Sequence, residues 1–153
     1  TAAGQAVSGK TAAEIKWLCA NSPLPVIIKG VMTAEEAVAI ADAGAAGIVV
    51  SNHGGRVLDD TPGTAAVLPA IAQAVAGRLT VLVDGGVRTG WDVLKLLALG
   101  ADGVLLGRPL LIGAVGGADG VRVVLEKIKA ELVSAMIMTG CPTCQAAGAH
   151  LLA

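Results

Sequence analysis

The chain contains no tyrosine and no phenylalanine, and two tryptophans are its only large aromatic residues in 153 positions. Its core must therefore be aliphatic, and any site that uses a tyrosine must take it from another chain. An excess of one charge is also lacking, because 11 Lys and Arg are balanced by 12 Asp and Glu. Without a basic field, neither nucleic acid nor an anionic membrane surface is expected as a partner.

Membrane spans, export signals and disulfide scaffolds are not indicated either. The longest stretch without acidic or basic residues other than histidine, 132–153, is interrupted by threonine, proline and glutamine, and the first residues lack the apolar core of a secretory signal. We expect a cytoplasmic protein. Three cysteines are too few for a disulfide scaffold, and the spacing Cys141-Pro142-Thr143-Cys144 has no second pair, so no metal is expected.

Short apolar runs alternate with helical patterns along most of the chain, and apolar residues make up 54% of it. Capping boxes at Thr11 and Thr33, each with Glu three residues on, mark two helix starts. The pattern predicts strands at 26–28, 47–50, 80–83 and 103–106. Helices are predicted at 11–21, 33–44, 64–76, 89–99 and 121–139. Continuous apolar strands between helices favour a parallel sheet covered by helices.

An internal repeat refines this α/β prediction. Shifting the sequence by 56 residues places Gly30, Thr33 and Gly44 on Gly86, Thr89 and Gly100 without a gap. Two βαβα pairs in tandem make half of a TIM (β/α)₈ barrel, although an open doubly wound sheet is an alternative. We therefore predict that residues 1–153 form the C-terminal half of a barrel, four parallel βα units preceded by one helix. Such a half would expose two edge strands and an apolar interior, so it should need an N-terminal half.

Polar residues occur where each expected strand ends. They are Lys29, Ser51-Asn52-His53, Asp84-Gly85-Gly86 and Gly107-Arg108, in strand order. In barrels and open parallel sheets, the carboxyl ends of the strands form the edge where ligands bind. We expect these four segments to surround one ligand site.

The last two segments have the features of a phosphate site. Gly85-Gly86-Val87-Arg88-Thr89-Gly90 connects a strand to a helix, and Gly107-Arg108-Pro109 follows the next strand. Glycine lets backbone N–H groups approach a phosphate, a helix start adds a positive pole, and arginine forms charge-assisted bonds. The alternative is that the glycines only mark turns and that the arginines are solvated.

The first two segments offer acid–base chemistry. The Lys29 ammonium could stabilise an anion on a cofactor ring or a substrate, or could simply extend to solvent. His53 can act as a base near neutral pH, and the planar fork of Arg56 suits a carboxylate. A loop histidine without a catalytic role is the alternative, which the neighbouring arginine and the other segments disfavour.

Together these segments resemble the FMN-dependent α-hydroxy acid oxidases and dehydrogenases, the glycolate and lactate oxidase family. The most specific block is Ser51-Asn52-His53-Gly54-Gly55-Arg56-Val57-Leu58-Asp59. The resemblance extends from about Thr11 to Cys141, with the segments in the order and spacing of that family.

The resemblance implies FMN as cofactor and a role for each matched residue. His53 would take a proton from a small 2-hydroxy acid as two electrons pass to the flavin, and Arg56 would pair with the substrate carboxylate. Lys29 would stabilise the reduced flavin, and Ser51 would also contact it. The ribityl chain and phosphate would be bound by Asp84, Gly85, Gly86, Val87, Arg88, Gly107 and Arg108.

The chain also departs from the family. Family members take a tyrosine pair, an aspartate that orients the histidine and a second arginine from their first four strands, and this chain has no tyrosine. We therefore expect activity only together with an N-terminal half. One alternative is a non-catalytic half barrel that binds FMN or phosphate and self-associates. Another is a different FMN barrel, such as a relative of type 2 isopentenyl diphosphate isomerase or IMP dehydrogenase, which the His53–Arg56 spacing disfavours.

Overall fold

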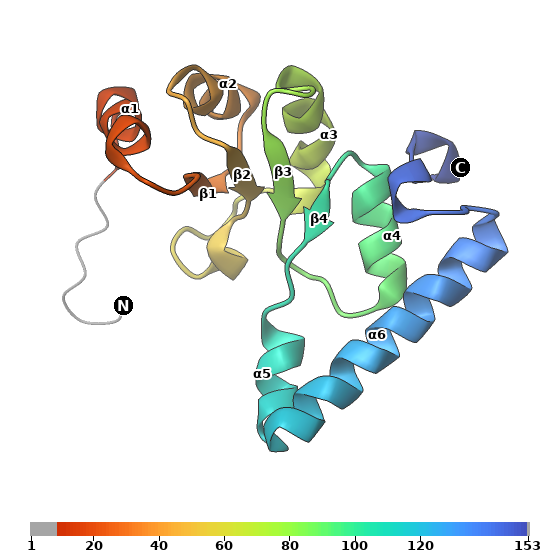
Figure 1. Cartoon of the computed structure of the whole chain (residues 1–153). Coiled ribbons are helices and arrows are strands. Elements are labelled where there is room, and N and C mark those ends of the chain that lie inside the picture. Colours follow the sequence, from red (N-terminus) through yellow and green to blue (C-terminus); the bar gives the residue numbers. More distant parts are fainter. Residues whose placement is uncertain (1–8, 153) are drawn as a thin grey trace.

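The computed structural model describes residues 9–152 (Figure 1). None of the helices in this described part is both long and apolar enough to cross a membrane. The elements in chain order are α1 (Ala12–Asn21), β1 (Ile27–Val31), α2 (Ala34–Asp42), β2 (Gly47–Val50), the 3₁₀ turn η1 (His53–Gly55), α3 (Thr64–Ala74), β3 (Thr80–Val83), α4 (Gly90–Ala98), β4 (Gly103–Val104), α5 (Arg108–Ala114), α6 (Gly117–Thr139), and the 3₁₀ turns η2 (Cys144–Ala146) and η3 (Ala149–Leu151).

The four strands form one parallel sheet in the order β1-β2-β3-β4. Helices α2, α3 and α4 pack on the same face of this sheet (Figure 1). A doubly wound sheet would reverse its strand order at a switch point, whereas successive neighbours are the order found around a barrel. The open-sheet alternative is therefore wrong, and the four strands are arranged as in a barrel segment whose edges are β1 and β4.

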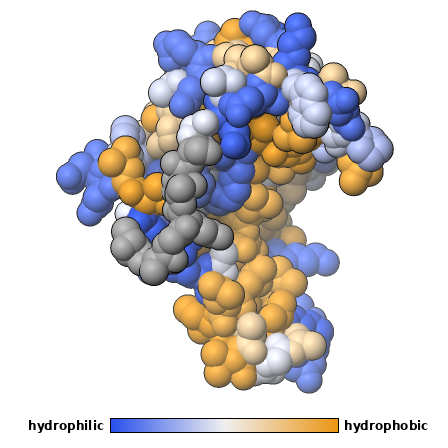
Figure 2. All heavy atoms as spheres, turned by 90° about the vertical axis from the view of Figure 1, so that its left-hand side faces the viewer, coloured by the Kyte–Doolittle hydropathy of each residue, from blue (hydrophilic) through white to orange (hydrophobic). Residues whose placement is uncertain are grey.

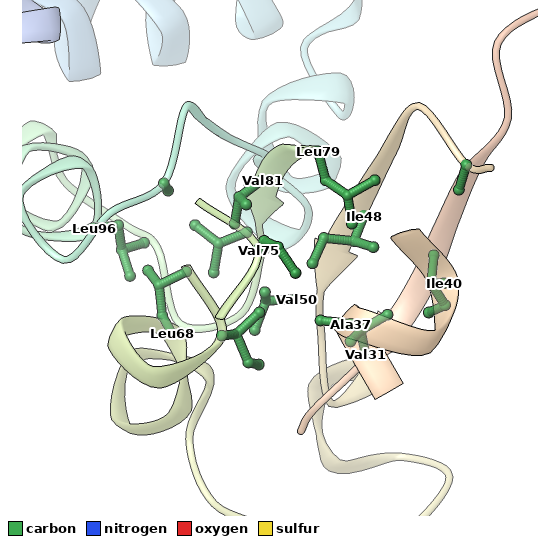
Figure 3. Packing of buried hydrophobic residues seen from close by; sticks show 14 of the residues in the cluster. Val31, Ala37, Ile40, Ile48, Val50, Leu68, Val75, Leu79, Val81 and Leu96 are labelled. Carbon is green, nitrogen blue, oxygen red and sulfur yellow. The ribbon is translucent and has the colours of Figure 1, made fainter. Parts of the chain in front are cut away.

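The core between sheet and helices is aliphatic, as the absence of Phe and Tyr requires. Figure 3 shows Ile48 and Val50 of β2 facing Ala37 and Ile40 of α2, with Leu68 of α3 beside them. Ile48, Val50 and Leu68 are fully buried. This tight packing fixes the strand ends from which the polar residues project.

Three threonines start helices as the sequence predicts. In each capping box, the threonine side chain accepts from a backbone N–H while an acidic side chain three residues on accepts from the threonine N–H. The 56-residue shift maps the bounds of α2 onto those of α4, and Gly44 and Gly100 after them have φ values of 89° and 106°. The internal repeat is therefore a repeat of structure. The capping threonines are Thr11, Thr33 and Thr89.

The two edge strands differ from their predicted lengths. Strand β1 continues to Val31, so Lys29 and Gly30 lie within it and not after it. A register shift against β2 between Lys29 and Val31, with a φ of 101° at Gly30, identifies a β-bulge. Strand β4 ends at Val104, two residues earlier than predicted, where its pairing with β3 ends.

The C-terminal helices also correct the prediction. Residues 108–114, for which no helix was predicted, form α5, and the long helix begins at Gly117 and not at Val121. Only two of the six apolar residues that recur at helical spacing in this segment are buried, namely Ile128 and Ala135, whereas Val121, Val124, Leu125 and Leu132 are not. The reason is that α6 packs mainly on the helices α4 and α5, so it needs no broad apolar face against a sheet.

Candidate active site

A pocket of about 360 Å³ lies at the edge of the sheet where the strands end. It is lined by β1, by the loop after β2, by the turn after β3 and by the segment leading into α5. The structure therefore brings together the four segments that are far apart in the sequence. All the predicted site residues except Ser51 line it, namely Lys29, His53, Arg56, Asp84, Gly85, Gly86, Val87, Arg88, Gly107 and Arg108.

Ser51 lies buried beside this pocket and connects two of its walls. The Lys29 ammonium donates to Ser51 Oγ at 2.6 Å and to Asp84 Oδ2 at 2.7 Å. Ser51 Oγ also accepts from the backbone N–H of His53 at 3.2 Å. One fully buried hydroxyl therefore links the lysine of β1 to the histidine loop.

His53 is held in an unusual backbone conformation within η1. Its φ is 56°, in the left-handed region that a residue with a side chain seldom adopts. The loop is fixed by Asn52 Oδ1, which accepts from the N–H of Gly54 at 3.0 Å. The imidazole packs on Gly30, because a Cβ at Gly30 would lie 2.5 Å from His53 Cε1. The glycine of the β1 bulge therefore leaves the space that the histidine ring occupies.

Arg56 is anchored next to the same histidine. Its Nε donates to the backbone carbonyl of His53 at 3.2 Å, which uses one of its five N–H donors. Within residues 9–152 it forms no ion pair. The terminal nitrogens of the guanidinium are thus free to bind an anion beside the imidazole.

The turn after β3 carries an unpaired carboxylate oxygen. Asp84 Oδ1 is buried and has no hydrogen-bond partner among the described residues, while Oδ2 is bound by Lys29. The backbone of the turn is held by Thr64, whose hydroxyl donates to the Asp84 carbonyl at 2.7 Å. A buried carboxylate oxygen strongly favours a donor, so this position suits a ligand hydroxyl or N–H.

The start of α4 corrects one expectation about phosphate binding. Its first amides are already bound by carboxylates: Asp92 Oδ2 accepts from the N–H groups of Arg88 and Thr89, and Glu131 Oε2 accepts from Gly90. Partial burial acts to raise the pKa of Asp92, but these hydrogen bonds outweigh it and lower that pKa below its usual value. The positive pole of α4 is therefore compensated within the chain, and an anion in the pocket depends on other donors.

Those donors are the arginine side chains and the glycine backbone. Neither Arg88 nor Arg108 forms an ion pair within the described chain. The Arg108 guanidinium extends to the histidine loop, where its Nη2 lies 3.5 Å from the position of a Cβ at Gly54. At Gly86 no atom lies within 4 Å of such a position, so the backbone there is open to a ligand.

Two residues with structural roles near the pocket were not found from the sequence. Thr64 and Glu131 act through partners 20 and 41 residues away, so no local pattern indicates them. Asn52 belongs to the predicted block, but its role in capping the turn was not predicted. An asparagine two residues before a pair of glycines is a signal for such a turn.

The cysteine pair lies away from this pocket. Cys141 is buried against Leu94 and Ala135, at the contact between α4 and α6. Among the residues that the structure describes, no group of three or more His, Cys, Asp and Glu side chains is placed to hold a metal ion.

The chain is similar in sequence and fold to known 2-hydroxy acid oxidases. A peroxisomal (S)-2-hydroxyacid oxidase of Arabidopsis thaliana is 50% identical over 131 residues, which cover 85% of this chain and 36% of that protein. An L-lactate oxidase of Roseobacter sp. (strain GAI101) is 48% identical over 141 residues, covering 92% of this chain and 38% of the relative. The chain thus spans somewhat more than a third of the length of these relatives.

A solved structure supports the same relation. Mandelate oxidase with (S)-mandelic acid matches with a TM-score of 0.86 at 46% identity, over 90% of this chain and 42% of the other. This confirms the predicted fold, four βα units of a (β/α)₈ barrel. The model of the family described as FMN-dependent dehydrogenase matches residues 2–153, and the chain therefore belongs to the FMN-dependent dehydrogenase family.

Proposed function

We propose that this chain carries the cofactor site and the proton acceptor of an FMN-dependent oxidase or dehydrogenase that converts a small 2-hydroxy acid, such as lactate or glycolate, to the 2-oxo acid. The observation that carries the proposal is the meeting of His53 and Arg56 in one pocket with Lys29, Arg88 and Arg108. A base, a carboxylate clamp and an anion site are the groups that this reaction needs.

The residues present fit FMN. Four cationic side chains and one carboxylate, Asp84, line the pocket, which suits a phosphate dianion together with a substrate carboxylate. The unpaired Asp84 Oδ1 can accept from a ribityl hydroxyl. Arg88, Arg108 and the open backbone at Gly86 would hold the phosphate. When bound, FMN supplies the acceptor for the two electrons.

The protein's own part in the reaction is to bind the substrate, to orient it and to take its proton. Arg56 would hold the substrate carboxylate with its terminal nitrogens, since its Nε is committed to the His53 carbonyl. This places the adjacent hydroxyl at the imidazole, and His53 would take the hydroxyl proton. Lys29 would stabilise negative charge that develops on the flavin.

The open edges of the sheet support a requirement for a complementary half barrel. Leu24, before β1, and Ile27 in it are 73% and 48% exposed, and Leu111 and Ile112 of α5 and Val115 directly after it are 70%, 74% and 90% exposed. Figure 2 shows apolar surface gathered at the lower end of the molecule, where Figure 1 places α5. An apolar surface of this kind favours association, with an N-terminal half barrel as the proposed occupant and self-association as the alternative.

The cytoplasmic location stays a prediction, and the Arabidopsis relative is named peroxisomal.

The test is a pair of histidine variants in the chain combined with an N-terminal barrel half from a relative. His53→Ala should retain the flavin absorbance but lose at least about a thousandfold in turnover of glycolate or lactate, because the proton acceptor is gone. His150→Ala removes the other histidine of the chain and should leave turnover unchanged. Normal turnover in His53→Ala would refute the assignment of the base.

An anaerobic spectrum separates the catalytic proposal from the inert half barrel. Adding lactate or glycolate to the flavin-loaded complex should bleach the flavin absorbance if the complex oxidises the acid. A complex that keeps its colour with both acids would support the non-catalytic alternative.

A further inference from the structure

Helix α6 crosses the first turn of α4 at direct backbone contact. A Cβ at Gly90 would lie 2.0 Å from the backbone nitrogen of Leu132 and 2.4 Å from the carbonyl oxygen of Ile128. Only glycine therefore permits this approach. The contact places a helix that lies outside the pocket against the residue two positions after Arg88.

A carboxylate of α6 binds the buried backbone amide of Gly90 at this crossing. Glu131 Oε2 accepts from the N–H of Gly90 at 3.0 Å. The second oxygen of Glu131 is bound by the Lys127 ammonium, one turn earlier on α6. The hydrogen bond from Lys127 and then that from Gly90 lower the pKa of Glu131, so the group is a carboxylate at neutral pH. Its orientation is fixed from two sides.

Glu131 completes a row of three bound amides. Asp92 accepts from the N–H groups of Arg88 and Thr89 at 3.0 and 2.9 Å, and Glu131 takes the next one, that of Gly90. The backbone from Arg88 to Gly90 is thereby held by one carboxylate from α4 and one from α6. Since the Arg88 side chain lines the pocket and forms no ion pair within the described chain, its direction depends on this backbone.

We propose that Glu131 is a positioning residue for the anion-binding side of the pocket, which acts by holding the α4 start so that Arg88 extends toward the phosphate of the cofactor. The inference rests on the proposed function, because it assumes that FMN binds in this pocket. Glu131 is proposed to act through the geometry of the α4 start and not through its own charge. A negative charge near the anion site would by itself weaken phosphate binding.

The test compares FMN with riboflavin, which lacks the phosphate. The flavin affinity of the purified chain, alone and combined with the N-terminal half of a relative, is measured by quenching of flavin fluorescence. Glu131→Ala should raise the Kd for FMN about tenfold, as expected when a charge-assisted hydrogen bond that orders the site is lost, while the Kd for riboflavin changes less than about twofold. Glu131→Gln keeps an oxygen that accepts from Gly90 and should restore FMN binding to within about threefold.

Controls separate this role from stability. Glu126→Ala removes an exposed glutamate of α6 that pairs with Arg122, and it should change neither Kd. If Glu131→Ala does not fold, Lys127→Met loosens the same carboxylate and should raise the Kd for FMN about threefold without affecting riboflavin. Hydrogen exchange at Arg88, Thr89 and Gly90 should accelerate in Glu131→Ala and not in Glu126→Ala.

Four results would overturn the inference. Equal loss of FMN and riboflavin binding, or a lower melting temperature with unchanged affinity, would make Glu131 merely structural. Tighter FMN binding in both Glu131 variants would show that its charge dominates. The fourth result is that the unsubstituted chain binds FMN no better than riboflavin, both alone and combined with the N-terminal half. In that case the proposed function itself would fail, and this inference with it.

Discussion

The buried hydroxyl of Ser51 offers a direct test of how the pocket is held together. Ser51→Ala removes the acceptor that serves both the Lys29 ammonium and the His53 backbone N–H. The Lys29 side chain is 45% exposed and keeps Asp84 as a partner, so losing its hydrogen bond to Ser51 should cost only about 0.5 kcal/mol. The His53 amide is partly buried and has no other partner among the described residues, so leaving it unbound should cost about 1.5 kcal/mol.

The free energy of unfolding of Ser51→Ala should therefore fall by about 2 kcal/mol, equivalent to a decrease in melting temperature of about 4–8 °C for a chain of this size. Urea unfolding followed by circular dichroism measures the first quantity, and calorimetry measures the second. Ser134→Ala is the matched control, because that hydroxyl is exposed on α6 and donates only to the Ala130 carbonyl. A Ser51 variant within about 0.5 kcal/mol of the Ser134 variant would refute the idea that this hydroxyl links the two walls.

Two further predictions concern the β1 bulge and the start of α4. Gly30→Ala adds a Cβ that would lie 2.5 Å from His53 Cε1 at a φ of 101°, so it should lower the free energy of unfolding by about 3 kcal/mol. Gly55→Ala, at a φ of 71° with nothing within 4 Å, should cost only the backbone strain of about 1 kcal/mol. Asp92 has a lowered pKa in the folded chain, so its stabilising effect is present above the ordinary aspartate pKa of about 3.9 and is lost as the pH falls through the folded value. Asp92→Asn should therefore destabilise the chain at pH 7, and this difference should shrink as the pH falls below the ordinary aspartate pKa.

Urea unfolding at several pH values measures all of these effects. Equal losses for the two alanine variants would mean that the histidine ring does not need the space at Gly30. A difference between Asp92→Asn and the unsubstituted chain that stays constant from pH 7 to pH 2 would contradict the role assigned to the Asp92 carboxylate.

Local chemistry explains which parts of the fold were predictable. Thr11 and Thr33 indicated the starts of their helices because a capping box consists of four consecutive residues. The strand from Gly47 to Val50 was predicted to the residue, since a central parallel strand must be apolar on both faces. The site at the polar strand ends was predictable because the carboxyl ends of parallel strands lie at one edge of the sheet.

The errors arose where the structure depends on distant partners. The helix that starts at Arg108 has proline at its second position and glycine near its end, so its sequence resembles a loop, and its packing on α6 stabilises the helix. The contact of Glu131 with Gly90 joins helices that the sequence places 41 residues apart. The site was therefore predictable as a set of side chains, whereas the network that orients them was not.

The bulge at Gly30 has a consequence for how the sheet assembles. Lys29 pairs with Val49, but Val31 and not Gly30 pairs with Val50, so one residue is left over. Ile28 and Val31 both face the helices as a result, and Lys29 faces the opposite side. If β1 slid by one residue along β2, an ammonium group would enter the aliphatic layer and a valine would leave it. The extra glycine thus helps to define the register of the edge strand, because Ile28 and Val31 can both face the core while Lys29 stays out of it only in this alignment.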